Sequence, residues 1–143
     1  MKKNSVSFQD YPFGQKRKEI IRTLTGKLLE EITLAAVLNG ELTAQDVRIS
    51  PHTLLLQAEI ADLAGRKCLA NNFRRAAELC HLPDDKIMEI YNALRPYRCT
   101  KKQLESIATE LEQNHNAVLN AKLVREAARA YEQRNFLKDS RPD

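Results

Sequence analysis

Hydrophobic residues recur at steps of three and four positions along most of the chain, which is the spacing of one face of an α-helix. The clearest case is the stretch 71–98, where two such patterns are joined by a short break. The two apolar stripes comprise, in chain order, Phe73, Ala76, Ala77 and Cys80, and then Ile87, Ile90, Tyr91 and Leu94. Pro83 predicts the break, because it disfavours the helical conformation at Leu82. Asp84 is then expected to cap the second helix, with Asp85 stabilised near its positive end.

Other helix boundaries are marked by capping residues and by glycine. Ser50 followed by Pro51 predicts a helix start, since the hydroxyl caps the helix and proline fits its first position. Gly65 either ends this helix, because glycine readily adopts the left-handed conformation that ends helices, or lies inside one long helix at a cost of about 1 kcal/mol relative to Ala; we prefer the break. The expected helices span 33–39, 51–64, 66–80, 84–95, 100–115 and 117–136.

Two further capping signals and the lack of a strand pattern also favour a helical fold. Thr43 and Asp46, and likewise Thr100 and Gln103, have the spacing of a capping box, in which two backbone N–H groups are satisfied reciprocally. No stretch alternates apolar and polar residues over a useful length, so we predict no significant sheet. The chain has only four Gly and five Pro. It is rich in Ala, Leu, Glu, Lys and Arg, which lose little side-chain freedom in a helix.

A chain of 143 residues has the length of one domain. We predict an all-α protein with a single small helical domain of about five or six helices over 19–138. An extended N-terminal arm over 1–18 precedes it, and a frayed tail over 139–143 follows. Pro12 and Gly14 discourage a helix in the arm. The arm is either a partly ordered terminus or a segment that docks its aromatic residues on a partner; these are Phe8, Tyr11 and Phe13.

The composition is that of an ordinary globular protein, with 43% hydrophobic and 29% charged residues. No apolar run approaches the roughly 20 residues of a membrane-spanning helix. No apolar stretch of about 7–15 residues follows the basic start, as a secretory signal would require. We therefore expect a cytoplasmic protein. Cysteines lack a CxxC spacing, which argues against a disulfide framework; Cys68 and Cys80 are expected to be buried, and Cys99 to be more exposed.

The sequence carries none of the motifs of a self-sufficient active site. Its four glycines are isolated, which excludes a glycine-rich phosphate loop, and HExxH and GxSxG are absent. Cys80 and His81 are adjacent, and adjacent helical side chains point about 100 degrees apart, so they converge poorly on one metal ion. Asp84 and Asp85 are explained by their place at a helix start. We predict no catalytic, cofactor-binding or metal-ligating residue in this chain.

Two places have the composition of a protein interface. Arg95, Tyr97 and Arg98 surround a predicted helix end, and Tyr and Arg are the residue types that most often carry interface energy. An equal alternative is a solvated charge cluster in which Tyr97 is half packed on its own domain. Tyr11 and Pro12 of the N-terminal arm form the second place. We take these five residues as candidate contacts with a partner.

Four blocks carry a resemblance to a known family: DYP at 10–12, TGKLLEEITLAAVLNGELTAQDVRIS at 25–50, ELCHLPDDKIMEIYNALRPYR at 78–98 and AKLVREAARAYEQR at 121–134. In this order, from about Asp10 to about Lys138, the chain resembles the small (gamma) subunit of adenosylcobalamin-dependent diol and glycerol dehydratases. The DxHxxG motif of chains that hold base-displaced cobalamin is absent. The resemblance therefore implies a subunit that contributes surface rather than chemistry.

What the resemblance implies is a multi-chain enzyme that converts glycerol or 1,2-propanediol to the corresponding aldehyde and water. In that family a large (alpha) barrel subunit carries the substrate, a K⁺ or Ca²⁺ ion and the radical chemistry. A medium (beta) subunit helps to enclose adenosylcobalamin, and the assembly holds two copies of each of three chains. The small subunit packs on the large one and binds no cofactor itself. Only nine residues precede Asp10, which resembles the glycerol-dehydratase type and argues less for association with a protein microcompartment.

The basic balance of the chain leaves one alternative, a stand-alone helical nucleic-acid-binding module. The net charge is +4, but the 19 acidic residues are mixed with the 23 basic ones. No predicted helix has Arg and Lys clustered on one face, so we expect neither nucleic acid nor membrane as a partner. On the dehydratase hypothesis, removing the residues before Lys16 is expected to loosen the complex.

Overall fold

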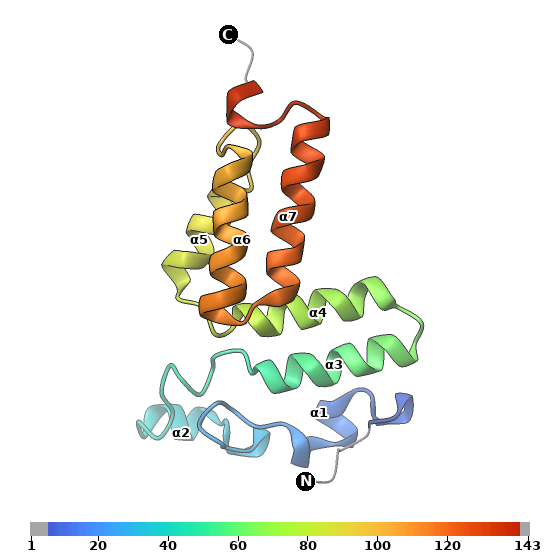
Figure 1. Ribbon diagram of the computed structural model, residues 1–143. Coiled ribbons are helices and arrows are strands. Elements are labelled where there is room, and N and C mark those ends of the chain that lie inside the picture. Colours follow the sequence, from blue (N-terminus) through green and yellow to red (C-terminus); the bar gives the residue numbers. More distant parts are fainter. Residues whose placement is uncertain (1–5, 141–143) are drawn as a thin grey trace. The chain divides into compact units, whose positions relative to one another are not determined.

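The computed structural model describes residues 6–140, which fold into helices (Figure 1). These residues form no strand, and one isolated antiparallel bridge joins Arg22 to Leu28. The all-α prediction is therefore confirmed. The helices are α1 (Phe13–Lys16), α2 (Leu34–Leu38), α3 (Pro51–Leu63), α4 (Lys67–Leu79), α5 (Asp84–Ala93), α6 (Lys101–His115) and α7 (Val118–Gln133). All but the short α1 correspond to helices expected from the sequence.

Internal contacts divide the chain into two compact units, 1–80 and 81–143. The boundary falls beside the break that Pro83 predicts. The expected domain bounds of 19–138 stay a prediction. Of the tail expected to fray, Asp139 and Ser140 lie in a 3₁₀ turn, and residues 141–143 lie outside the described part of the chain.

The predicted extended arm is wrong for residues 6–18, which fold into short helical turns. A 3₁₀ turn over Phe8–Asp10 is followed by α1, which contains Gly14, and by a second 3₁₀ turn over Lys18–Ile20. The reason is burial: Phe13 is only 2% exposed and packs with Leu56 and Ile60 of α3. Burying an aromatic side chain outweighs the weak local preference of this segment. Residues 1–5 of the predicted arm lie outside the described part of the chain.

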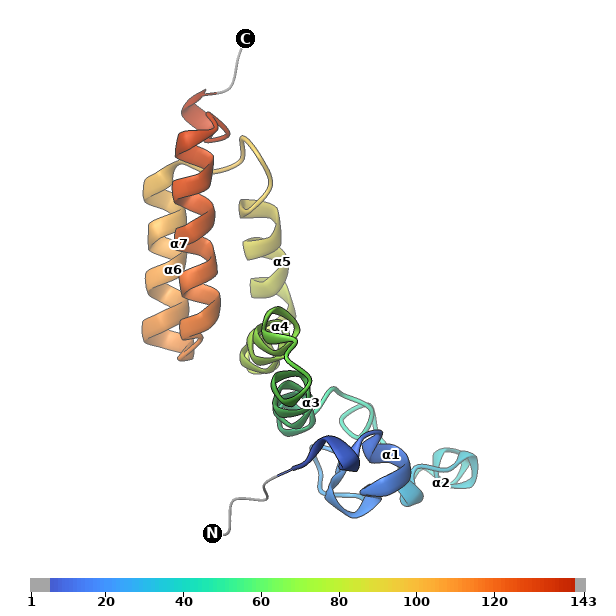
Figure 2. The ribbon, with the colours of Figure 1, turned by 90° about the vertical axis from the view of Figure 1, so that its right-hand side faces the viewer.

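In the first unit, α3 and α4 form an antiparallel pair of helices, which lie side by side in Figures 1 and 2. The Ser50 side chain accepts a hydrogen bond from the Thr53 N–H, and Pro51 is the first helical residue, as predicted. Gly65 has a φ of +73°, which confirms the predicted break. The seam between the two helices is built from small side chains, with Phe73 packed against them: Ala58, Ala61 and Ala70.

The apolar positions along α3 predict a broad inward face of Leu54, Leu55, Ala58, Ala61 and Ala64, and part of this prediction is wrong. Leu55 and Ala64 are exposed, whereas Leu56 and Ile60 are buried. Leu56 and Ile60 lie four residues apart and face Phe13, a contact that the spacing within α3 alone does not reveal.

In the second unit, α6 and α7 lie side by side and α5 runs beside them (Figure 2). The fully buried large side chains of this unit are Leu104 and Leu111 from α6 and Val124 from α7. Three alanines of the same two helices are also without exposed surface, and we call them the alanine seam: Ala108, Ala121 and Ala128. Side chains this small let two helices approach closely.

Ion pairs tie the helices of the second unit across their exposed edges. Lys101 Nζ lies 2.7 Å from a Glu132 carboxylate oxygen, joining the start of α6 to the end of α7. Arg125 of α7 contacts Glu112 at 2.6 Å. Lys86 of α5 lies 2.7 Å from Glu110 of α6, which fixes α5 on the pair. Exposed pairs such as Lys101 with Glu132 stabilise weakly, by up to about 1 kcal/mol each.

Helix ends in the second unit are mostly as predicted. Thr100 and Gln103 form the expected capping box. Asn116 ends α6 with a φ of +52° in the left-handed region. Asp84 is not the cap of α5, because Pro83 occupies the capping position and Asp84 lies inside the first turn. Tyr91, which the sequence places on the apolar stripe of α5, is instead exposed.

We predict that Phe13→Ala will destabilise the protein by about 3–5 kcal/mol, since it leaves a cavity between α1 and α3. Urea unfolding followed by circular dichroism measures this. Phe8→Ala is the matched control; Phe8 is 60% exposed, so its loss should cost less than about 1 kcal/mol. Equal effects of the two changes would show that Phe13 does not anchor the N-terminal segment.

Candidate partner interface

A buried carboxylate organises the segment between α1 and α3. The side chain of Asp46 has no exposed surface, although it lies in a stretch of turns. Its oxygens accept hydrogen bonds from the Thr43 N–H at 2.7 Å, the Thr43 hydroxyl at 3.0 Å and the Thr25 hydroxyl. Lys27 Nζ donates to the same carboxylate at 3.0 Å and also to the Glu41 carbonyl. We call Thr25, Lys27, Thr43 and Asp46 the Asp46 cluster.

The electrostatics of the Asp46 cluster favour the charged carboxylate. The Thr25 hydroxyl and then the Thr43 N–H hold the pKa of Asp46 well below its usual range, and Lys27 adds to the effect. Thr43 and Asp46 were predicted as a capping turn, and this is confirmed. Thr25 and Lys27 were missed, because they are 21 and 19 residues from Asp46 and no local spacing links them.

The segment that the Asp46 cluster ties together carries much of the exposed apolar surface of the chain. Helix α2 has the sequence LAAVL with no charged residue, and only Ala36 is buried. Leu34 is 74% exposed and Leu38 is 78% exposed. We call 24–49 the apolar segment, and its exposed large hydrophobic residues are Leu24, Leu29, Leu34, Val37, Leu38, Val47 and Ile49. Exposed apolar side chains gathered in this way are typical of a surface that another protein covers.

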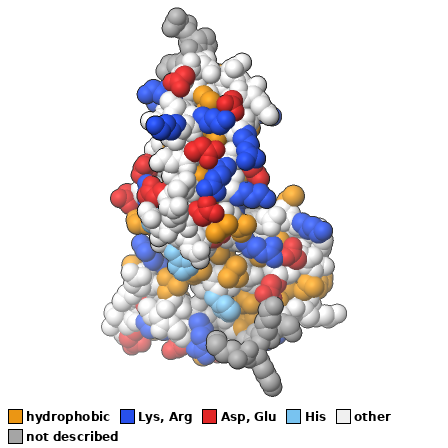
Figure 3. All heavy atoms as spheres, viewed as in Figure 1, with side chains coloured by type: hydrophobic (Ala, Val, Ile, Leu, Met, Phe, Trp, Pro, Cys, Tyr) orange, Lys and Arg blue, Asp and Glu red, His pale blue; other side chains and the backbone are white. Residues whose placement is uncertain are grey.

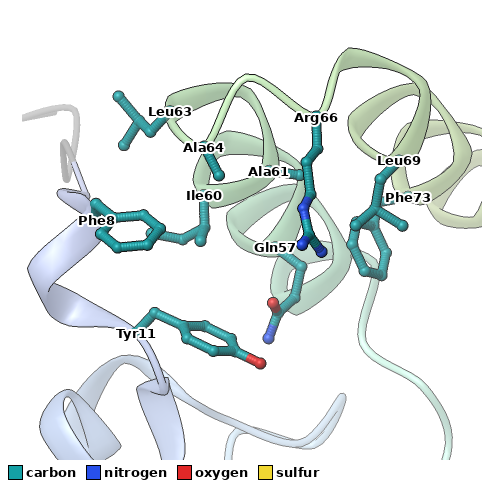
Figure 4. A pocket seen from close by; sticks show the side chains of 10 residues that line it. All are labelled: Phe8, Tyr11, Gln57, Ile60, Ala61, Leu63, Ala64, Arg66, Leu69 and Phe73. Carbon is teal, nitrogen blue, oxygen red and sulfur yellow. The ribbon is translucent and has the colours of Figure 1, made fainter.

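A second apolar feature of the first unit is a groove of about 630 Å³ between the N-terminal segment and α3 with α4 (Figure 4). We call it the N-terminal groove. Phe8 and Tyr11 form one side, while α3 and α4 supply the floor and the other side. The residues that line it are Phe8, Tyr11, Gln57, Ile60, Ala61, Leu63, Ala64, Arg66, Leu69 and Phe73.

Two of the five predicted contact residues lie at this groove or beside it. Tyr11 lines the groove and is about half exposed. The Tyr11–Pro12 peptide bond is cis, and Pro12 is partly buried. Phe13, which was grouped with Phe8 and Tyr11 as a docking aromatic, is in the core instead.

The other three predicted residues form a turn in the second unit. Tyr97 is partly buried; its N–H donates to the Phe136 carbonyl at 2.8 Å, and its ring meets Phe136 edge-on at 5.7 Å. Its φ of +62° is unfavourable for a residue with a Cβ, so these contacts hold a strained backbone in place. Arg95 and Arg98 are exposed. Tyr97 therefore supports the turn that presents the two arginines.

The exposure of the three cysteines differs from the prediction. Cys68 and Cys80 are exposed, not buried as predicted, and Cys99 is the least exposed of the three. Burial raises the pKa of Cys99.

Within residues 6–140, no group of three or more His, Cys, Asp or Glu side chains is placed to hold a metal ion. None of the helices in that range combines the length and the hydrophobicity needed to cross a membrane.

The family model for the dehydratase small subunit matches residues 6–138. This chain belongs to the dehydratase small-subunit family. It is 56% identical over 135 residues to the propanediol dehydratase small subunit of Citrobacter freundii, covering 94% of this chain and 78% of the relative. It is 54% identical over 134 residues to the propanediol dehydratase small subunit of Salmonella typhimurium, with the same coverage. The resemblance seen in the sequence is confirmed.

Membership of the dehydratase small-subunit family gives the exposed surfaces a meaning. A small subunit implies other dehydratase subunits as partners. Exposed apolar surfaces such as the apolar segment and the N-terminal groove are typical of protein contacts.

The acid sensitivity of this small-subunit family member is expected to depend on Asp46. Its folded-state pKa lies below the ordinary value of 3.8. Asp46 therefore contributes stability that is fully present above that value and is lost as the pH falls through the folded-state pKa. We predict that Asp46→Asn lowers the unfolding midpoint near neutral pH and removes about one proton from the uptake on acid unfolding.

Urea unfolding at a series of pH values between about 2 and 7 measures both quantities. Glu59→Gln, which neutralises an exposed carboxylate on α3, is the control and should leave the midpoint near neutral pH unchanged. If Asp46→Asn behaves like this control, the Asp46 cluster does not hold the segment.

Proposed function

We propose that this chain is a structural, non-catalytic subunit of a dehydratase that converts 1,2-propanediol or glycerol to the corresponding aldehyde and water. The observation that supports it is the apolar segment, which is exposed on a chain 56% identical to a propanediol dehydratase small subunit. Both relatives are named for propanediol, so a propanediol is the first substrate to assay and glycerol the second.

The proposed partners are a large and a medium dehydratase subunit, with two copies of each of the three chains in the assembly. An assembly of this kind is held together by permanent interfaces, which typically bury more than about 2,000 Å². Permanent interfaces are apolar, like a domain core cut in two. The uncharged helix α2 and the exposed Val47 and Ile49 beyond it have that character.

Adenosylcobalamin and a K⁺ or Ca²⁺ ion are proposed to belong to the assembled enzyme and to be held by the other chains. No cluster of three His, Cys, Asp or Glu side chains converges within residues 6–140. The polar side chains that line the N-terminal groove are Gln57, Arg66 and the Tyr11 hydroxyl. We therefore assign no step of the reaction to a residue of this chain.

The alternative of a nucleic-acid-binding module is not supported. Over α6 and α7, the face in Figure 3 shows Lys and Arg interspersed with Asp and Glu, not a continuous basic stripe. Many of these charges are paired with each other, as Lys101 is with Glu132. Charges neutralised in this way give little attraction for phosphates.

We propose a cytoplasmic location for the assembled enzyme.

The test of this function is co-expression of the chain with the large and medium subunits encoded beside it, followed by purification through a tag on the large subunit. We predict that Leu34→Asp with Leu38→Asp abolishes co-purification, because it places two charges in an apolar interface. Lys102→Glu is the matched control; it changes the net charge by the same amount at an exposed site on α6 and should co-purify fully. Full retention of the Leu34/Leu38 variant would remove α2 from the interface.

The turn that Tyr97 supports gives a separate prediction. Arg95→Ala with Arg98→Ala is expected to raise the dissociation constant for the large subunit by about tenfold or more, as loss of interface arginines commonly does. Arg129→Ala, at an exposed site on α7, is the control and should have no effect. Surface plasmon resonance against the complex of the other two subunits measures it. Unchanged binding of the double variant would leave the turn as part of the fold alone.

A further inference from the structure

The N-terminal groove combines apolar walls with one cationic group. Ile60 and Ala61 form a buried floor, and Phe8, Leu63, Leu69 and Phe73 stand around it. Arg66 is the charged residue among those lining it. Figure 4 shows the Arg66 side chain pointing into the groove, between Gln57 and Phe73, with the Tyr11 hydroxyl directed toward Gln57.

Arg66 is available to an incoming acidic group. The neighbouring carboxylate of α3, Asp62, pairs with Arg74 rather than with Arg66. Arg66 lies just before the first residue of α4, where the backbone N–H groups of the helix start also favour negative charge. A guanidinium holds a carboxylate through two parallel hydrogen bonds, and the exposed Arg66 is accessible to one. The groove is therefore complementary to an apolar side chain that stands beside a carboxylate.

The exposure of the walls favours a protein segment over a small molecule. A small-molecule site buries about 70–90% of its ligand and is itself largely enclosed. Here Phe8 and Leu63 are more than half exposed. Only an occupant that continues past the rim of the groove can cover them, as a chain segment of a partner does.

We propose that the N-terminal groove binds a segment of a larger dehydratase subunit in which an aromatic or aliphatic side chain lies next to an Asp or Glu. The apolar side chain fills the space between Phe8 and Phe73, and the carboxylate binds Arg66. The proposal rests on the proposed function, since it names the partner segment of the same interface. It assigns the recognition of that segment to Arg66, which no sequence motif singles out.

The experiment uses the co-expressed complex of all three chains. Arg66→Glu is expected to weaken retention on the tagged large subunit, with a dissociation constant at least about tenfold higher, because attraction becomes repulsion. Arg66→Lys keeps the charge and should lose less. Lys67→Glu is the matched control; it reverses the adjacent exposed charge, which does not line the groove, and should be retained fully. Circular dichroism checks that each variant folds.

A second measurement identifies the occupant. A photo-crosslinking amino acid at Leu63, at the exposed rim, should crosslink in the assembled complex to a peptide of a larger subunit that contains an apolar residue beside Asp or Glu. Crosslinks to a peptide without an acidic residue, or to a second copy of this chain, overturn the proposal. So does full retention of Arg66→Glu.

The two proposals fail in different ways. If the unaltered chain does not co-purify with the larger subunits, the proposed function itself is wrong. If the unaltered chain co-purifies and Arg66→Glu does so equally well, only the assignment of the groove is wrong.

Discussion

The burial of a single carboxylate is the constraint that closes the segment between α1 and α3. Asp46 draws hydroxyl, ammonium and backbone N–H donors from two stretches about 20 residues apart in sequence, Thr25–Lys27 and Thr43–Asp46. None of the described helices packs broadly against α2, and its only buried side chain is Ala36. The Asp46 cluster therefore holds together the two ends of the segment that contains α2, a task that a hydrophobic core performs for most helices. This arrangement leaves Leu34 and Leu38 of α2 exposed.

Local signals in the sequence predict most helix ends, although Asp84 was wrongly taken as a cap, whereas the long-range contacts could not be found from the sequence. The cap at Ser50, the break at Gly65 and the box at Thr100 each depend on residues within four positions of each other, so spacing alone predicts them. Phe13 was assigned to an extended arm, because its partner Leu56 lies more than 40 residues away. The partners of Asp46 were missed for the same reason. A pattern of spacing reports on one helix, whereas a tertiary contact joins two.

The predicted contact residues show the same difference between local signals and long-range contacts. Tyr97 was weighed equally as a contact and as part of the fold, and its bond and ring contact to Phe136 show a role in the fold. The apolar segment could have been suspected from the uncharged run LAAVL, but such a run is also what a buried helix contains. Units of about 60–80 residues bury only about 60% of the surface of the unfolded chain. A large partner surface would therefore add stability that neither unit can supply from its own core.

The alanine seam between α6 and α7 limits how this part of the protein can change over time. Ala108, Ala121 and Ala128 have no exposed surface, and each side chain is a single methyl group on one of two helices that pack against each other. A longer side chain at any of them would act as a wedge and cost about 1–3 kcal/mol. The spacing between α6 and α7 is thus set by alanine, the smallest side chain that has a Cβ. Residues on the outer faces of α6 and α7 can be substituted freely, while the distance between the two helices cannot change.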